Sequence, residues 1–248
     1  MPPGNPASPH AEGRAARAAL DRARDRAAGA LGVRPLELSF TSGGTEACAL
    51  AVLGAGRRLP PDAAVVTWTT EHQAVLGAVR RLESEGHRTA VLSPGELVLP
   101  AGTGLVSVGL ANNEVGTLGP VAEVAAAARA AGALVHLDAC QGPQWIRPPL
   151  PLVDLASFSG HKLGAGSGGL LYARQGLVLE PLQEGGPQEF GRRPGREDVR
   201  SAVAIATALA VCADRREEAG RAIAPLGARL QALLEELGGR PTGGSPRL

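Results

Sequence analysis

The chain has a single lysine, Lys162, in a setting that suits a reactive amine. It closes the run SFSGHK at residues 157–162, where its neighbours are small or carry hydroxyl groups, and the glycine-dense segment 164–169 follows it. Such a lysine is either an ordinary surface charge or, when desolvated, an amine that loses its proton and forms an imine with an aldehyde. We favour the second interpretation, in which Lys162 is catalytic and joins an aldehyde cofactor or substrate.

Two further residues, Asp138 and His72, carry side chains that complement an aldehyde cofactor. Asp138 follows the apolar stretch 134–137, where a carboxylate is rarely buried without a partner. It either caps backbone groups or keeps a ring nitrogen protonated, as the pyridine of pyridoxal phosphate requires in order to draw electrons from a carbanion. His72 alone reads as an ordinary histidine, but beside such a ring an imidazole could stack on the cofactor and move protons near neutral pH.

Other motifs are weaker. Residues 164–169 match the dinucleotide pattern GxGxxG, but they lead into an expected strand and not from a strand into a helix, so we interpret them as a flexible turn. Cys48, Cys140 and Cys212 form neither a CxxC pair nor a zinc-type spacing, and we expect them to be small buried residues. We therefore expect no metal site.

Composition limits the classes of partner. The net charge is +1 at pH 7, so bulk electrostatics predict binding to neither nucleic acid nor a membrane surface. No apolar run approaches the roughly 20 residues of a membrane span, and the first residues do not resemble a secretory signal, so we expect a cytoplasmic protein. With only 2% aromatic residues, the core must be built from leucine, valine and alanine.

Hydrophobic periodicity predicts helices and strands that alternate along most of the chain. The expected strands are residues 36–40, 64–68, 89–92, 105–110, 134–137 (ending at Asp138), 155–158 and 169–172. The expected helices are residues 11–32, 47–53, 73–85, 121–131, 197–218 and 225–237. Strands separated by helices predict an α/β fold, with a mostly parallel sheet flanked by helices on both faces.

A set of polar residues falls at or just after the ends of expected strands: Thr45, His72, Asn113, Asp138 and Lys162. Functional residues of such sheets lie just beyond the strand ends, so we predict that these side chains converge on one cleft. The order strand, loop, helix around residues 41–47 adds an anion site, because the free amides at a helix N-terminus and nearby hydroxyls bind anions.

A series of short motifs resembles those of the class V aminotransferases, and within them the cysteine desulfurases, which use pyridoxal phosphate. The motifs follow the family's order: GNPASPH at 4–10, FTSGGTE at 40–46, TEH at 70–72, NNEVG at 112–116, HLDACQ at 136–141, SFSGHK at 157–162 and GGPQE at 185–189. The resemblance covers about residues 4–236. It implies the large domain of a fold-type I pyridoxal-phosphate enzyme at residues 11–196 and the helical start of an incomplete small domain at residues 197–237. The two prolines and four glycines of residues 238–248 predict a flexible tail.

The resemblance also implies roles for the matching residues around the cofactor ring. Lys162 would be the lysine that forms the imine, and His72 would stack on the ring and handle protons. Asp138 would pair with the ring nitrogen, Gln141 would hydrogen-bond the phenolic oxygen, and Asn113 would lie near the substrate or the ring.

The same resemblance implies a phosphate site. Its members would be the Gly44 amide and the side chains of Thr45, Ser159 and His161. This agrees with the anion site expected from the strand, loop and helix around residues 41–47.

Some family features have no match in this sequence. The family carries its persulfide on a cysteine in a mobile loop beyond the lysine and binds the substrate carboxylate with a later arginine, and neither is matched here. We therefore expect a chain shortened at both ends. Arg196 stands where the family has a threonine that reaches the phosphate of a neighbouring subunit.

The function implied is a pyridoxal-phosphate-dependent cysteine desulfurase-like enzyme that acts on an amino acid such as L-cysteine through an imine on Lys162, with weak or absent sulfur transfer. The alternative is a non-catalytic remnant or subunit that pairs with a complete paralogue. The expected partners are a small amino-acid substrate, a second copy in a homodimer or a paralogue, and a sulfur-acceptor protein, but neither nucleic acid nor a membrane.

Overall fold

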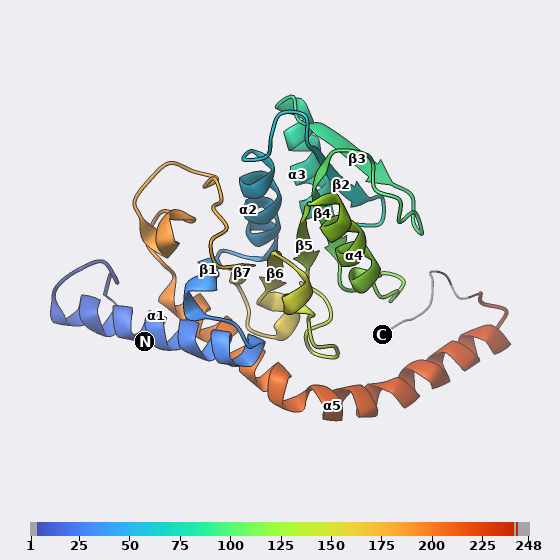
Figure 1. Ribbon diagram of the computed structural model, residues 1–248. Coiled ribbons are helices and arrows are strands. Elements are labelled where there is room, and N and C mark those ends of the chain that lie inside the picture. The colour runs from blue at the N-terminus through green and yellow to red at the C-terminus, as the bar shows by residue number, and fades with distance from the viewer. Residues whose placement is uncertain (1–3, 241, 243–248) are drawn as a thin grey trace.

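Seven strands form one sheet across the centre of the molecule (Figure 1). They are β1 (Leu38–Thr41), β2 (Ala64–Trp68), β3 (Arg88–Leu92), β4 (Thr103–Gly109), β5 (Leu134–Asp138), β6 (Leu155–Ser159) and β7 (Gly169–Ala173). Their order in the sheet is β1-β7-β6-β5-β4-β2-β3. The computed structural model describes residues 4–240 and residue 242.

Of these strands, only β7 runs against the others. β2 pairs in parallel with β3 and β4, and the parallel row continues through β5 and β6. β7 is antiparallel to both β6 and β1, so β1 again runs with the parallel set. The sheet confirms the predicted α/β fold class with mostly parallel strands.

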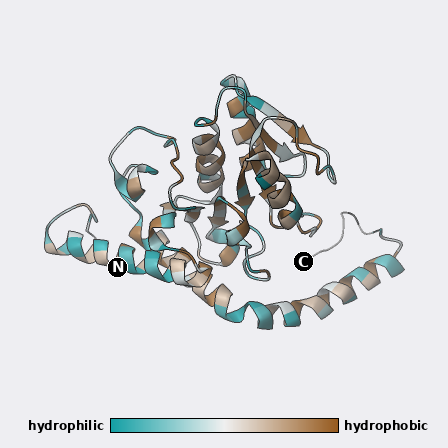
Figure 2. Ribbon diagram, in the orientation of Figure 1, coloured by the Kyte–Doolittle hydropathy of each residue, from teal (hydrophilic) through white to brown (hydrophobic). Residues whose placement is uncertain are grey.

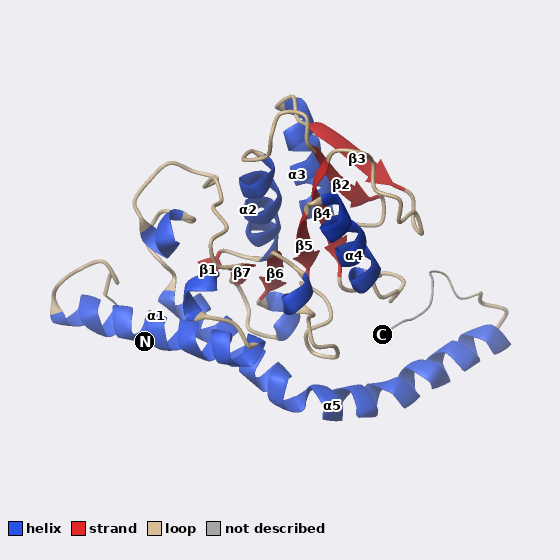
Figure 3. Ribbon diagram, viewed as in Figure 1, coloured by secondary structure: helices blue, strands red, loops and turns tan. Residues whose placement is uncertain are grey.

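Helices cover both faces of the sheet (Figure 3). In the described residues they are α1 (Ala11–Leu31), α2 (Gly44–Gly56), α3 (Gln73–Ser84), α4 (Val121–Ala131) and α5 (Val199–Glu236). Alternate strand residues serve the two faces. Val65 and Leu105 pack with α2 and α3, whereas Val66 and Val106 belong to the cluster with α1, α4 and α5. Apolar residues gather in the strands and on the helices that cover them, as Figure 2 shows.

α1 follows its sequence signals closely. At its start, His10 Nδ1 accepts a hydrogen bond from the Gly13 amide at 3.2 Å. At its end, Gly32 takes φ 70°, a left-handed conformation that glycine adopts without strain. These two caps explain why the helix predicted at residues 11–32 is found at Ala11–Leu31.

The predicted strand at residues 36–40 begins too early. Residues Pro35–Glu37 form a 3-10 turn, and β1 starts at Leu38. Glu37 Oε2 accepts a hydrogen bond from the Arg34 amide at 2.8 Å, and the proline ring fixes the φ of the first turn residue. The hydrogen bond and the fixed φ of Pro35 both favour a turn. The helix predicted at residues 47–53 is also longer than expected, because α2 begins at Gly44.

The two helices predicted at residues 197–218 and 225–237 are one continuous helix, α5, which contains Pro225. A proline removes one helical N–H and usually ends a helix, but the alanine, leucine, arginine and glutamate residues on either side have high helix propensity. The outer part of α5 projects from the sheet (Figure 1), and Leu226, Leu230 and Leu233 there are exposed. The assignment of residues 197–237 to a second domain stays a prediction.

Residues 241 and 243–248 of the predicted flexible tail lie outside the described residues. Across the part of the chain that the structure describes, no helix combines the length and the apolar character needed to cross a membrane.

A buried ion pair joins α1 to the segment that follows β7. The Arg24 guanidinium donates to Glu189 Oε1 at 2.7 Å and to Oε2 at 2.8 Å, and the same carboxylate accepts from the Phe40 amide at 2.8 Å. Arg24 Cζ also lies 4.9 Å from the ring centroids of Phe40 and Phe190. These contacts hold Glu189 and Phe190 at φ 49° and 61°, where non-glycine residues are strained.

Removing the carboxylate of this pair should destabilise the fold strongly. We expect Glu189→Ala to lower the free energy of unfolding by about 3–5 kcal/mol, because the Arg24 charge would stay buried without a partner. Asp21→Ala is the matched control, since it breaks the exposed Arg17–Asp21 pair of the same helix and should cost about 0–1 kcal/mol. Urea unfolding measures both, and equal losses in the two variants would contradict the central role of Glu189.

Candidate active site

The carboxyl ends of the parallel strands meet at one edge of the sheet, and the predicted site residues lie there. Asp138 and Ser159 are the last residues of β5 and β6. Thr45, His72 and Lys162 follow β1, β2 and β6 within a few residues. Asn113 belongs to the turn after β4. The structure thus brings the predicted residues to the same edge, while their roles stay predictions.

The amino end of α2 is packed against the ends of β5 and β6. A Cβ built on Gly44 would lie 2.6 Å from Cys140 Sγ and 2.8 Å from Ser159 Cβ, so glycine is required at this position. Ser159 Oγ lies 2.8 Å from His161 Nδ1. Because the first amides of a helix have no partner within the helix, this corner combines backbone N–H groups with a hydroxyl and an imidazole. That set of donors suits a phosphate.

Contacts with Glu46 secure the first turn of α2, which carries Thr45. Glu46 Oε2 accepts from the Ser42 amide at 2.7 Å, and Oε1 accepts from Arg193 Nε at 2.8 Å. Burial alone would raise the pKa of Glu46, but the hydrogen bonds from Arg193 and Ser42 outweigh it and lower this pKa. The turn is therefore tied through a carboxylate to the segment after β7, while the side chain of Thr45 is exposed.

Lys162 lies in a short 3-10 helix, His161–Leu163, directly after β6. Its side chain is exposed, which differs from the desolvated amine that we expected, because the turn carries it out beyond the end of the strand. The Gln144 side chain donates to the Lys162 carbonyl oxygen and fixes the backbone. Gly164, Gly166 and Gly168 take φ 78°, 75° and 108°, so the motif that follows the lysine is a glycine turn into β7, as predicted.

Two loops next to this edge are joined by Asn112. Its Nδ2 donates to the Thr70 carbonyl at 3.1 Å, and its Oδ1 accepts from the Glu114 and Val115 amides. His72 caps α3, with Nδ1 accepting from the Ala74 amide at 3.1 Å. Because Nδ1 must be the acceptor there, the proton of a neutral His72 lies on Nε2. Its exposed ring thus offers one N–H to a ligand.

Asp138 is buried at the end of β5, with 7% of its surface exposed. Its Oδ1 accepts from the Cys140 amide at 3.0 Å. The aspartate therefore does satisfy a backbone group, which was one of the two roles open from the sequence. The carboxylate also interacts with the Cys48 and Cys140 thiols. Gln141, which follows in the same loop, is partly buried.

Beneath Asp138, a buried histidine joins three strands. His136 has no exposed surface, and its Nδ1 and Nε2 lie 2.8 Å from Ser107 Oγ and 2.9 Å from Ser157 Oγ. Burial lowers the pKa of His136 to about 4, although the charge of Asp138 opposes this. The ring is therefore neutral at pH 7. His136 stands out in the sequence as a polar residue within an otherwise apolar strand, but nothing in the sequence indicated that Ser107 and Ser157 would be its partners.

Glu71 is a second group that the sequence indicated only as part of a motif. Its Oε1 accepts from the Gly109 amide at 3.0 Å, and Gly109 lies opposite Asp138 in the pairing of β4 with β5. Burial, aided by the charge of Asp138, raises the pKa of Glu71 to about 8. Glu71 is thus largely protonated at pH 7.

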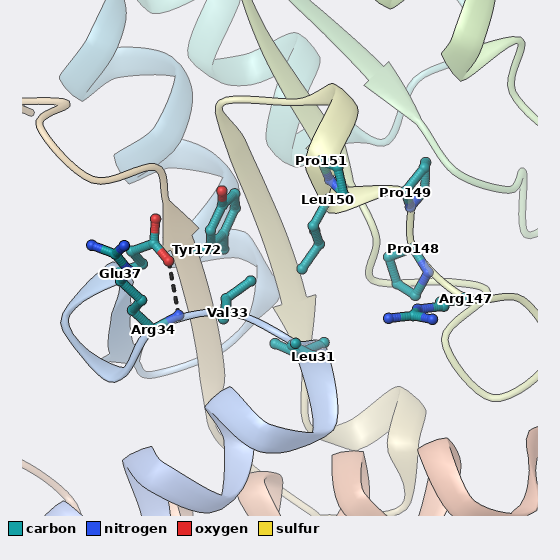
Figure 4. Close-up of a pocket in the computed structure, with 11 residues that line it drawn as sticks. Leu31, Val33, Arg34, Glu37, Arg147, Pro148, Pro149, Leu150, Pro151 and Tyr172 are labelled. Carbon is teal, nitrogen blue, oxygen red and sulfur yellow. Dashed lines mark hydrogen bonds between the residues drawn. The ribbon is translucent and has the colours of Figure 1, made fainter.

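A separate cavity of about 670 Å³ lies at the opposite edge of the sheet, near the start of β1 (Figure 4). It is lined by residues that include Leu31, Arg34, Arg147, Leu150 and Tyr172. The hydrogen bond from the Arg34 amide to Glu37 forms part of its wall. None of the predicted site residues lies there. The cavity is therefore separate from the candidate active site that contains Lys162 and Asp138.

Comparisons with known proteins agree with this fold. Residues 3–193 match the family model described as Aminotransferase class-V. The chain is 37% identical to cysteine desulfurase 2 of Trichormus variabilis over 220 residues, which cover 83% of this chain and 55% of the relative. It is 39% identical to a cysteine desulfurase of Bradyrhizobium diazoefficiens over 242 residues, covering 92% and 62%. The chain thus spans little more than half the length of these curated relatives.

Solved structures resemble it as well. A NifS-like protein superposes with a TM-score of 0.89 at 33% identity, covering 95% of this chain and 69% of that one. DndA from Streptomyces lividans gives a TM-score of 0.81 at 34% identity, covering 93% and 70%. The family match over residues 3–193 and the likeness to these structures show that the chain belongs to the class-V aminotransferases, a family of pyridoxal-phosphate enzymes.

Proposed function

We propose that this chain forms the cofactor-binding part of a cysteine desulfurase-type enzyme that acts on a small amino acid such as L-cysteine. The observation that supports the proposal is the meeting of an exposed lysine, a buried carboxylate and a helix amino end at one edge of a parallel sheet. Similarity to cysteine desulfurases supports the substrate class.

The residues present fit pyridoxal phosphate. The Gly44 amide, Thr45, Ser159 and His161 would hold the phosphate, since they offer N–H, hydroxyl and imidazole donors at the tightly packed amino end of α2. Asp138 would pair with the ring nitrogen through the oxygen that the Cys140 amide does not use. Gln141 would donate to the phenolic oxygen. When bound, the cofactor supplies an electron sink for a carbanion at the substrate α-carbon.

Protons would be handled by Lys162 and His72. Lys162 lies in the 3-10 helix just before the glycine turn, and its Nζ would take the α-proton of a bound amino acid and return it. His72 presents Nε2–H, because Nδ1 is held by the Ala74 amide, so it would orient over the ring and donate from Nε2. Asn113 would contact the substrate from the turn that Asn112 fixes.

Sulfur transfer would need a further nucleophile. Among the described residues, Cys48 is buried and Cys212 lies within α5. Burial, opposed by Arg216, raises the pKa of Cys212, and the thiolate is the nucleophilic form. We assign persulfide chemistry to none of the cysteines of this chain, and we propose weak or absent sulfur transfer for it.

A second candidate function follows from α5. Exposed Leu226, Leu230 and Leu233 present apolar surface beyond the body of the molecule, and such surface commonly marks an interaction site. The chain would then act as a non-catalytic subunit of a complete paralogue. Sulfide release from L-cysteine by the purified chain alone would count against this candidate.

The lysine can be tested directly. We expect the purified chain with pyridoxal phosphate to shift the absorbance of the cofactor, and borohydride reduction to leave one cofactor mass on the peptide that contains Lys162. Lys162→Arg keeps the positive charge but cannot form an imine, so it should show neither the shift nor the added mass. An unchanged absorbance shift in Lys162→Arg would sink the proposal.

The pH dependence of stability tests the neutral state of Glu71. The pKa of Glu71 is raised from 4.5 to about 8 in the folded chain, so between these values only the unfolded state loses the proton and stability falls as the pH rises. Glu71→Gln removes this loss. Its stability relative to wild type should therefore increase by up to about 1.4 kcal/mol per pH unit over that range and level off above it.

Urea unfolding of the cofactor-free chain between pH 5 and pH 9 measures this difference. Glu83→Gln, at an exposed position of α3, is the matched control for loss of a carboxylate. If the curves of Glu71→Gln and wild type run parallel over the whole pH range, Glu71 is ionised in the folded chain and the assignment is wrong.

A further inference from the structure

Two cysteines far apart in the sequence meet beside Asp138. Cys48 comes from α2, one helical turn after Gly44, and Cys140 comes from the loop after β5. The Sγ atoms of Cys48 and Cys140 and a carboxylate oxygen of Asp138 all lie within 4.8 Å of one another. Cys48 is 1% exposed and Asp138 7%, and Cys140 is partly buried, so the cluster lies between α2 and the sheet.

This geometry is close to that of a metal site. Zinc binds thiolate sulfur at about 2.3 Å in a tetrahedral arrangement, which places two ligand sulfurs roughly 3.8 Å apart. Atoms that already lie within 4.8 Å can reach this spacing through side-chain movements of about 1 Å or less. No backbone rearrangement is needed.

The chemistry of the donors points to the kind of cation. Two sulfurs and one carboxylate oxygen favour zinc, cobalt or cadmium over magnesium or calcium, which prefer oxygen ligands. We propose that Cys48, Cys140 and Asp138 form a binding site for a thiophilic divalent cation such as zinc. Three protein ligands leave a fourth position for water or another ligand. On binding, the two thiol protons pass to solvent and are replaced by the cation.

Oxidation of the two thiols to a disulfide is less well supported. The hydrogen bond with Cys48, burial and the charge of Asp138 together raise the pKa of Cys140 well above its ordinary value. The hydrogen bond from Cys140 lowers the pKa of Cys48, but burial and Asp138 outweigh it and raise this pKa too. A raised thiol pKa slows reaction with oxidants, and it also makes cation binding depend on pH, because both thiol protons must leave.

The site has a consequence for the cofactor, and this part rests on the proposed function. Asp138 cannot bind a cation and pair with a protonated ring nitrogen at the same time, because both ligands are positive and would need the same carboxylate. Cys140 Sγ also borders Gly44 and therefore the expected phosphate corner. Cation and pyridoxal phosphate should thus exclude one another.

Cobalt titration of the reduced, cofactor-free chain tests the site. We expect one Co²⁺ per chain with a thiolate-to-cobalt charge-transfer band and the visible spectrum of a tetrahedral ion. Cys48→Ser and Cys140→Ser should each weaken cobalt binding by about tenfold or more, since losing even a neighbour of a ligand costs about 10–100-fold. Cys212→Ser is the matched control and should bind as wild type does. Absence of the band in wild type, or its loss only in Cys212→Ser, would overturn the proposal.

Two measurements guard against indirect effects. Circular dichroism and urea midpoints show whether the serine variants are folded, and the wild-type spectrum alone reports whether thiolates ligate the metal. Mutual exclusion of cation and cofactor is tested by adding pyridoxal phosphate to the cobalt-loaded chain. Free cofactor can also chelate cobalt, so Cys48→Ser with the same cobalt and cofactor serves as the control for that chelation. We expect the charge-transfer band to fall as the cofactor binds.

The outcomes separate the two proposals. Cobalt binding without any cofactor binding would keep the metal site and sink the proposed function. Cofactor binding without a thiolate–cobalt band would do the reverse. A cobalt band that persists while the cofactor binds fully would overturn the mutual exclusion.

Discussion

Parallel pairing is the constraint on which the candidate site depends. β4, β5 and β6 are direct neighbours that run in the same direction. Asp138 and Ser159, the last residues of β5 and β6, therefore lie at the same edge of the sheet. A single reversal among these strands would send one of the two residues to the far edge, some five residues of extended chain away. β7 is the one antiparallel member, and it enters the sheet at this edge directly after the glycine turn.

The second requirement is a close approach of α2 to the strand ends. Gly44 allows it, and the small side chains of Ser159 and Cys140 complete it. The buried polar groups below this corner are His136 and its two serines, which form hydrogen bonds between neighbouring strands. The interior below the site is thus held together by hydrogen bonds between neutral polar side chains.

The sequence predicted the parallel sheet and the edge where the polar residues gather, because both depend on local periodicity and on where strands end. Contacts between distant segments could not be predicted in this way. Cys48 meets Cys140 only because α2 packs over β5 and β6. The expectation of three small buried cysteines did not include this contact, and it was wrong for Cys140 and Cys212, which are only partly buried. The exposure of Lys162 and the continuity of α5 through Pro225 likewise depend on the surroundings of each residue and not on its type.

The pairing of β1 with β7 also sets an order of assembly. Leu38 lies opposite Tyr172, so the strand that leads into the phosphate corner has no partner until the chain has been made as far as β7. Contacts so distant in sequence form slowly, since a long loop must close before they contribute. On the ribosome, β2 to β6 can pair first, and α1 and β1 must wait. The strand that leads into the phosphate corner is therefore the last to join the sheet, and a ligand that binds at that corner selects chains whose sheet is complete.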